Sequence, residues 1–193
     1  MAKPAIILAS GSPQRRALLS ALGLDFEVRP PVIEEETDGD PREIVVVNAR
    51  RKAEAVASTV EGALVIAGDT EVVIDGEVLG QPGNAAEARA HLERLSGREH
   101  QVLGGLALLS ADRHQDDEPL TGVEVSAVAF RRLEPQLLEA YLASGEWRGR
   151  AGSYAIQGLG SALVDAVRGD VSNVIGLPIG LLLRLAPELV TTS

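Results

Sequence analysis

The chain has 193 residues, a hydrophobic fraction of 45%, a formal net charge of −10 and no cysteine. This length and hydrophobicity predict a substantial core in a single domain over residues 1–193. The acidic balance argues against broad binding of nucleic-acid polymers, and the lack of cysteine excludes disulfides and thiolate metal sites.

The first elements in chain order are a predicted strand over residues 5–9 and a predicted helix over 13–22. Ser12 suits the N-cap of this helix and Pro13 its first position. The apolar run at 5–9 is too short for a signal peptide or a membrane span, which predicts a cytoplasmic protein without a membrane partner.

Two arginines, Arg15 and Arg16, stand in the first turn of that helix. Positive charge is unfavourable there because the helix dipole already places partial positive charge at that end, and a bound anion would remove the cost. A strand end, a small-residue turn and a helix start also form a ready phosphate site, where Ser10 and Ser12 could donate hydroxyls. The alternatives are an ordinary exposed helix start and simple capping serines. We therefore expect a phosphorylated ligand.

The rest of the chain alternates predicted strands and helices and then continues as strands joined by hairpins. The expected helices cover 41–60, 84–95, 135–143 and 178–185, and the expected strands cover 25–29, 64–67, 101–109, 122–132 and 163–167, with a hairpin over 72–79. A polar loop covers 110–119, and a glycine-rich segment covers 145–160. The pattern predicts an α/β fold with a mixed twisted sheet and flanking helices.

Asp69 is a candidate for the chemistry because it follows the predicted strand 64–67, which we expect to end at residues 68–70. A carboxylate at the C-terminal end of a strand faces the usual ligand site of an open α/β sheet. There it could hold Mg²⁺ or activate a water as general base. The alternative is an aspartate that only stabilises a turn.

Three further positions have both a functional and a structural interpretation. Glu34, or its neighbour Glu35, could share a metal with Asp69 or lie in a solvated acidic loop, and the two alternate across an extended segment. Lys52 could reach a site with its stem buried or belong to a solvated basic helix face. Gln157 could contact a base edge or lie in a simple glycine-rich turn.

Six blocks of the chain together resemble the Maf family in order and spacing. The first, Leu8–Arg16, is similar to the family's S-x-S-P-x-R signature. The other blocks are Ala49–Ala53, Gly68–Thr70, Leu95–His100, Ala151–Gly158 and Gly176–Pro178. The resemblance covers nearly the whole chain, and an ordered set of blocks is far more specific than any one of them.

The Maf resemblance implies a nucleoside triphosphate pyrophosphatase, which cleaves between the α- and β-phosphates and releases a nucleoside monophosphate and pyrophosphate. It also implies a divalent metal cofactor (Mg²⁺ or Mn²⁺), a homodimer, and two lobes around a central cleft, similar to inosine triphosphate pyrophosphatases. Thr70 and the run 154–158 resemble the branch of the family that prefers dTTP and UTP.

The same resemblance implies roles for individual residues. Asp69 matches the proton acceptor, and the implied catalytic set is Asp69, Lys52 and Glu34, with Asp69 and Glu34 as metal ligands. The implied substrate-binding residues are Ser10, Ser12, Arg15, Arg16, Thr70, Gln81 and Gln157. Two positions depart from the family pattern. Gln14 replaces an arginine, and Gln81 replaces a lysine, which removes a phosphate counter-charge.

Gln81 keeps a second class of function open, a non-catalytic nucleotide-binding regulator of cell division. A third alternative is a nucleotidyltransferase, which would release pyrophosphate only when an acceptor is present. Incubation of the pure protein with triphosphates distinguishes the three functions. A hydrolase turns them over without an acceptor, a transferase needs the acceptor, and a regulator only binds them.

Overall fold

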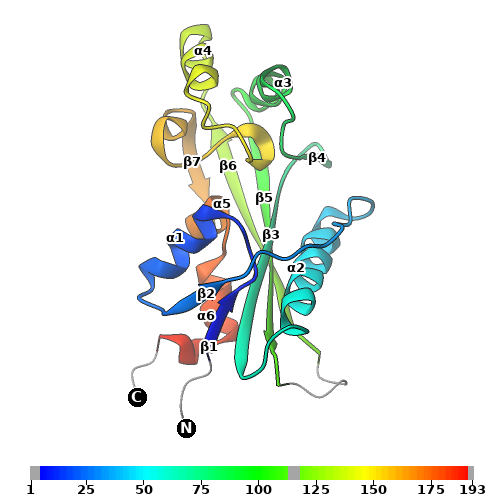
Figure 1. Ribbon diagram of the computed structural model, residues 1–193. Helices are drawn as coiled ribbons and strands as arrows, with labels where there is room; N and C mark the ends of the chain where they lie inside the picture. Colours follow the sequence, from blue (N-terminus) through cyan, green and yellow to red (C-terminus); the bar gives the residue numbers. More distant parts are fainter. Residues whose placement is uncertain (1–4, 113–117, 191–193) are drawn as a thin grey trace.

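The computed structural model describes residues 5–112 and 118–190, and these form one mixed sheet with flanking helices (Figure 1). The strands are β1 (Ala5–Leu8), β2 (Phe26–Val28), β3 (Ala63–Ile74), β4 (Glu77–Leu79), β5 (Glu99–Ser110), β6 (Leu120–Phe130) and β7 (Val164–Arg168). Their order is β2-β1-β3-β5-β6-β7, and β4 pairs with β3. β1 pairs in parallel with β2 and β3, and the other pairs are antiparallel, which confirms the predicted mixed sheet.

The helices begin close to where the sequence predicts them. They are α1 (Pro13–Ala21), α2 (Pro41–Ala57), α3 (Ala85–Leu95), α4 (Pro135–Ser144), α5 (Val171–Ile175) and α6 (Ile179–Leu185). Ser12 caps α1 and Asp40 caps α2, because each side chain accepts a hydrogen bond from a first-turn backbone N–H. α5 has only five residues, too few to show a helical period, and the sequence analysis missed it. None of the helices in the described ranges is both long and apolar enough to cross a bilayer.

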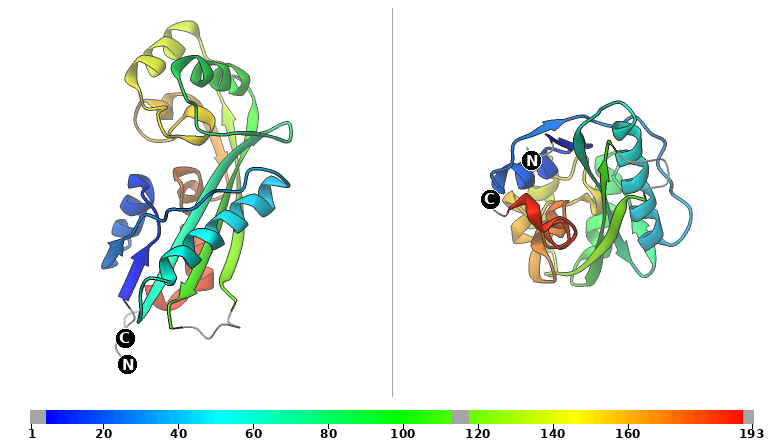
Figure 2. Two further views of the ribbon diagram at one scale, coloured as in Figure 1. Left: turned by 45° about the vertical axis from the view of Figure 1, so that its right-hand side comes forward. Right: turned by 90° about the horizontal axis from the view of Figure 1, so that it is seen from below.

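The long strands β3, β5 and β6 run through two lobes, the division that the family resemblance implies (Figure 1). In one lobe, Leu92 and Leu95 of α3 and Tyr141 of α4 share a hydrophobic core with the sheet. In the other lobe, α2 covers one face of the sheet, while α1 and α6 cover the opposite face (Figure 2). The glycine-rich segment lies in the first lobe and contains short 3₁₀ turns at Ala151–Ser153 and Gly158–Ala162. Residues 113–117 of the expected polar loop lie outside the described ranges.

Asp69 does not stand at a strand end, and the expectation that the strand stops at residues 68–70 is wrong. β3 continues to Ile74 as one strand. The reason is its antiparallel partner, because residues 64–73 pair with β5 in unbroken register, with Asp69 opposite Gly105. Asp69 is therefore held in the middle of a regular strand, where its backbone is fixed by the sheet.

On its other edge, β3 has no strand neighbour over residues 67–71 within the part of the chain that the structure describes. The pairing with β1 ends at Ile66, and the pairing with β4 begins at Val72. We call residues 67–71 the unpaired edge of β3. Because successive side chains of a strand point to opposite faces, groups from both faces of the sheet can reach the space beside this edge.

Candidate active site

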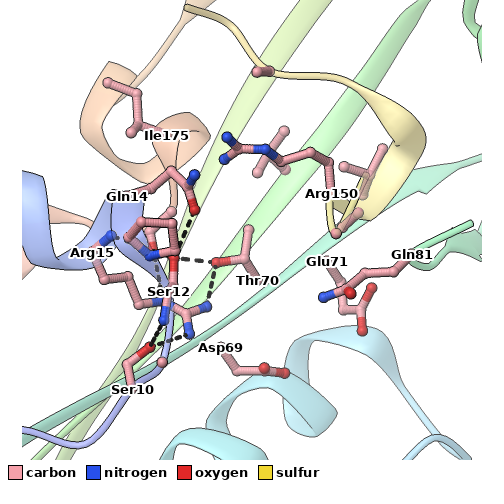
Figure 3. A pocket seen from close by; sticks show the side chains of 18 of the residues that line it. Ser10, Ser12, Gln14, Arg15, Asp69, Thr70, Glu71, Gln81, Arg150 and Ile175 are labelled. Atoms are coloured by element: carbon pink, nitrogen blue, oxygen red, sulfur yellow. Dashed lines mark hydrogen bonds between the residues drawn. The ribbon is translucent and has the colours of Figure 1, made fainter. Parts of the chain in front are cut away.

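A cavity of about 800 Å³ lies beside the unpaired edge of β3. Its walls come from the β1–α1 junction, the extended segment 30–35, α2, β3 and the glycine-rich segment. The predicted site residues that line it are Ser10, Ser12, Arg15, Lys52, Asp69, Thr70, Gln81 and Gln157, several of which Figure 3 shows. Arg15 and Asp69 therefore face one space, as the interpretation of the sequence requires.

Lys52 lies between two carboxylates on the α2 side of the cavity. Its Nζ is 2.7 Å from Oδ1 of Asp69 and 2.6 Å from Oε1 of Glu35. Asn48, one helical turn earlier on α2, donates from Nδ2 to Oδ2 of Asp69 at 3.3 Å. Lys52, Asn48 and Asp69 are all buried, so both oxygens of the Asp69 carboxylate are held in a defined orientation.

The structure places Glu35, not Glu34, at the cavity. The Glu34 side chain is exposed and does not line the cavity, whereas Glu35 lines it and binds Lys52. Asn48 fixes this register, because its side chain accepts from the backbone N of Glu36 at 2.7 Å and donates to the backbone O of Glu36 at 3.0 Å. Adjacent residues of an extended segment point to opposite sides, so the position predicted for Glu34 is occupied by Glu35.

Arg15 forms the cationic wall opposite Lys52. Its guanidinium donates to the backbone O of Gly176 at 2.8 Å, to Thr70 Oγ1 at 3.1 Å and to Ser10 Oγ at 3.2 Å. Burial lowers the pKa of Arg15. Arg16, in contrast, is exposed and does not line the cavity, because neighbouring helical residues point about 100° apart. The predicted substrate contact of Arg16 thus has no counterpart at this cavity.

Glu71 is a cavity residue that the sequence analysis missed. It stands two residues after Asp69, and because β3 is continuous, its side chain points to the same face of the sheet. Its Oε2 is buried and has no hydrogen-bond partner among the described residues. Burial, together with the carboxylates of Asp69 and Glu35, raises the pKa of Glu71 to about 7. The period of two along β3 would have identified Glu71 if the strand had been extended past Thr70.

The charged side chains that line the cavity balance one another. They are the cations Arg15, Lys52 and Arg150 and the carboxylates Glu35, Asp69 and Glu71. Within residues 5–112 and 118–190, no three carboxylate, histidine or cysteine side chains are placed to hold a metal ion by themselves. Mg²⁺ commonly takes one or two carboxylates and completes its shell with phosphate and water oxygens. Asp69 and the unpartnered oxygen of Glu71 fit that demand.

The wall formed by residues 154–157 is anchored by two aromatic hydroxyls. The Tyr154 hydroxyl lies 2.8 Å from Nε2 of His100, and the Tyr141 hydroxyl accepts from the backbone N of Ala155 at 3.0 Å. Burial lowers the pKa of His100 to about 4, so its ring is neutral at neutral pH and its role is to hold Tyr154. Gln157 follows this anchored run with an exposed side chain at the cavity, where its amide can meet a ligand.

We expect replacement of Glu71 by glutamine to change stability in a pH-dependent way. The pKa of Glu71 is about 7 in the folded chain against an ordinary value of 4.5, so the folded state holds the proton more tightly. The free energy of unfolding therefore falls as pH rises from about 4.5 to about 7, and the loss persists above that range. Glu71→Gln removes this loss and should stabilise the protein by about 1–3 kcal/mol at pH 8.

Urea unfolding at pH 4.5 and pH 8, with chelator present, measures this effect. Little difference between Glu71→Gln and wild type is expected at pH 4.5. Glu61→Gln, a change at an exposed carboxylate, is the matched control and should behave like wild type at both pH values. An equal difference at both pH values would contradict the assignment of the effect to the Glu71 proton.

Comparisons with known proteins agree in family and fold. A family model described as "Maf-like protein" matches residues 5–189. A Dictyoglomus thermophilum protein named dTTP/UTP pyrophosphatase is 43% identical over 180 residues, which cover 92% of each chain. An Anaeromyxobacter protein of the same name is 46% identical over 176 residues, or 90% of this chain and 84% of that relative. A HAM1 protein from Coxiella burnetii has a TM-score of 0.55 at 21% identity over 96% of this chain and 100% of its own, a likeness of fold.

Proposed function

The chain belongs to the Maf-like protein family, and on that premise we propose that it hydrolyses nucleoside triphosphates to a nucleoside monophosphate and pyrophosphate. The proposed substrate class is dTTP and UTP, after the name of the curated relatives. The observation that carries the proposal is the convergence of Arg15, Lys52 and Asp69 on one cavity. Cations that can bind phosphates there face a fixed carboxylate that can act on water.

In the proposed mechanism, Arg15, Lys52 and the start of α1 bind phosphate oxygens. Ser12 caps this helix, and Arg15 is held by Ser10 and Thr70, so the phosphate-binding groups are positioned before the substrate arrives. Asp69 orients a water and takes its proton as the water attacks the α-phosphorus. The bond between the α- and β-phosphates then breaks, and pyrophosphate leaves.

The proposed cofactor is Mg²⁺ or Mn²⁺, held by Asp69 with Glu35 or Glu71 from the same cavity. When bound, such a cation polarises the phosphoryl group and stabilises the charge on the leaving pyrophosphate. The balanced charges of the cavity walls support this proposal, because a triphosphate brings several negative charges that the protein alone does not offset.

Incubation of the pure protein with a panel of triphosphates tests the activity. We expect monophosphate and pyrophosphate from dTTP and UTP in the presence of Mg²⁺ or Mn²⁺, and loss of turnover by at least ~100-fold after chelation, since the cation offsets phosphate charge. Recovery on adding the cation back is the control for chelator damage. Nucleotide binding without turnover across the whole panel would favour a non-catalytic regulator of cell division, for which Gln81 is the supporting feature.

We also propose that the protein is a cytoplasmic homodimer whose protomer folds as one domain over residues 1–193. The family resemblance supports the dimer, and the composition supports the cytoplasmic location and the single domain. Light scattering on the pure protein measures the mass of the particle. A mass of one chain at micromolar concentration would contradict the dimer.

A further inference from the structure

Arg150 lines the cavity but has no part in the mechanism above. Its side chain is half-buried, and within the described ranges it makes no ion pair and no side-chain hydrogen bond. Where other arginines of the described residues lack such partners, as Arg42 and Arg132 do, they are exposed. Burial lowers the pKa of Arg150. An arginine that is partly removed from water and has no anionic partner points to a ligand that supplies the anion.

The backbone around Arg150 is held firmly against the sheet. The backbone N of Gly152 donates to the backbone O of Gly80 at 3.2 Å, and the backbone N of Ser153 donates to the backbone O of Arg150 at 3.0 Å. Gly152 has φ +66°, and a Cβ at this position would lie 2.8 Å from Cγ1 of Val72 in β3. Arg150 is therefore presented by a fixed turn, which lowers the entropy lost when its side chain binds a ligand.

The acidic neighbour of Arg150 is engaged elsewhere. The carboxylate of Glu146 accepts hydrogen bonds from the backbone N of Leu159 at 3.0 Å and of Gly160 at 3.1 Å. In Figure 3, the Arg150 side chain runs from the glycine-rich segment toward the side of the cavity where Gln14 lies. Gln14 and Gln81, which also line the cavity, carry no charge. Among the described residues that line this part of the cavity, Arg150 is thus the cation available to an anion.

The other two cations of the cavity are held beside Asp69, where the mechanism above has them bind phosphate oxygens. Lys52 binds Asp69 and Glu35, and all three hydrogen bonds of the Arg15 guanidinium go to oxygens of the protein. Arg150 comes from the opposite lobe, away from Asp69 in Figure 3. The attacked phosphorus must lie beside Asp69, so a phosphate near Arg150 is one of those that leave.

We infer that Arg150 binds the pyrophosphate part of the triphosphate, an inference that rests on the proposed function. Guanidinium groups pair with phosphate oxygens through two parallel N–H donors, which gives strength and direction. Arg150 then selects for the length of the phosphate chain. It should favour nucleoside triphosphates over monophosphates and should also bind the free pyrophosphate product.

Calorimetric binding tests this inference without requiring turnover. The probes are α,β-methylene-dTTP, dTMP and inorganic pyrophosphate, each with Mg²⁺. For Arg150→Gln, we expect affinity for the triphosphate analogue and for pyrophosphate to fall about 10- to 100-fold, as loss of a charged hydrogen bond predicts, with dTMP within about twofold of wild type. Arg150→Lys should recover part of the lost affinity, because lysine keeps the positive charge but lacks the two parallel N–H donors of the guanidinium.

Arg148→Gln is the matched control, because Arg148 is exposed, does not line the cavity and stacks on Trp147 at 4.8 Å. It should bind all three probes like wild type. The inference would be overturned if Arg150→Gln weakened the binding of dTMP and of the triphosphate analogue equally, or if it weakened the binding of neither. Wild-type turnover of dTTP is measured in parallel, so absence of hydrolysis would count against the proposed function while the binding comparison still decides the role of Arg150.

Discussion

Asp69→Asn is expected to lower the turnover of dTTP about 10²- to 10⁴-fold, the range for loss of a general base. Asparagine has nearly the shape of aspartate but cannot take a proton from water. The change should leave the fold intact, since Lys52 can still donate to the amide oxygen and keeps Glu35 as its anionic partner, and the change gives up only the longer hydrogen bond from Asn48. Steady-state rates of pyrophosphate release measure the effect, and circular dichroism confirms folding.

Glu34→Gln provides the matched control for Asp69→Asn. It makes the same carboxylate-to-amide change at a side chain that is exposed and does not line the cavity. We expect its rate to stay within about twofold of wild type, as for most surface changes away from a site. Near-native turnover in Asp69→Asn would remove Asp69 from the role of base, and a strong loss in Glu34→Gln would restore Glu34 to the site.

Local signals in the sequence were enough to predict most of the elements. Ser12 and Asp40 are N-caps in the structure because their side chains satisfy backbone N–H groups that no other part of the helix can reach. The pattern of strands and hairpins predicted the mixed sheet for a similar reason, since short connections make neighbours antiparallel. These features depend on residues close together in the chain, so they can be predicted from one sequence without knowledge of the fold.

The details of the site depend on contacts between distant segments. The sequence left Glu34 and Glu35 equivalent, and Asn48 decides between them by binding the backbone of Glu36. The end assigned to the strand before Asp69 was wrong because the pairing with β5 carries β3 onward. Because of that error, Glu71 was not identified from the sequence. Arg150 was not identified because no pattern in the neighbouring residues shows that the glycine-rich segment faces α1. The cavity itself was predicted only through the family resemblance.

Gly104 and Gly105 are an instance of a sequence signal whose meaning appears only in the structure. They interrupt the apolar run of β5, where glycine ordinarily weakens a strand. Gly105 stands opposite Asp69 in the register, and a Cβ there would lie 2.0 Å from the backbone O of Val45 in α2. The missing side chain therefore allows α2 to lie against the sheet. That close approach brings Lys52 to Asp69.

Gly105→Ala is accordingly expected to destabilise the protein by about 3 kcal/mol, the upper part of the usual range for overpacking, because the obstructing atoms are backbone and cannot rotate away. The shift of α2 should also separate Lys52 from Asp69 and lower turnover in the molecules that remain folded. Urea unfolding and steady-state rates measure the two effects. Gly80→Ala is the control, since a Cβ there meets no heavy atom within 4 Å. Unfolding curves that coincide for Gly105→Ala and Gly80→Ala would show that α2 does not depend on this contact for its position.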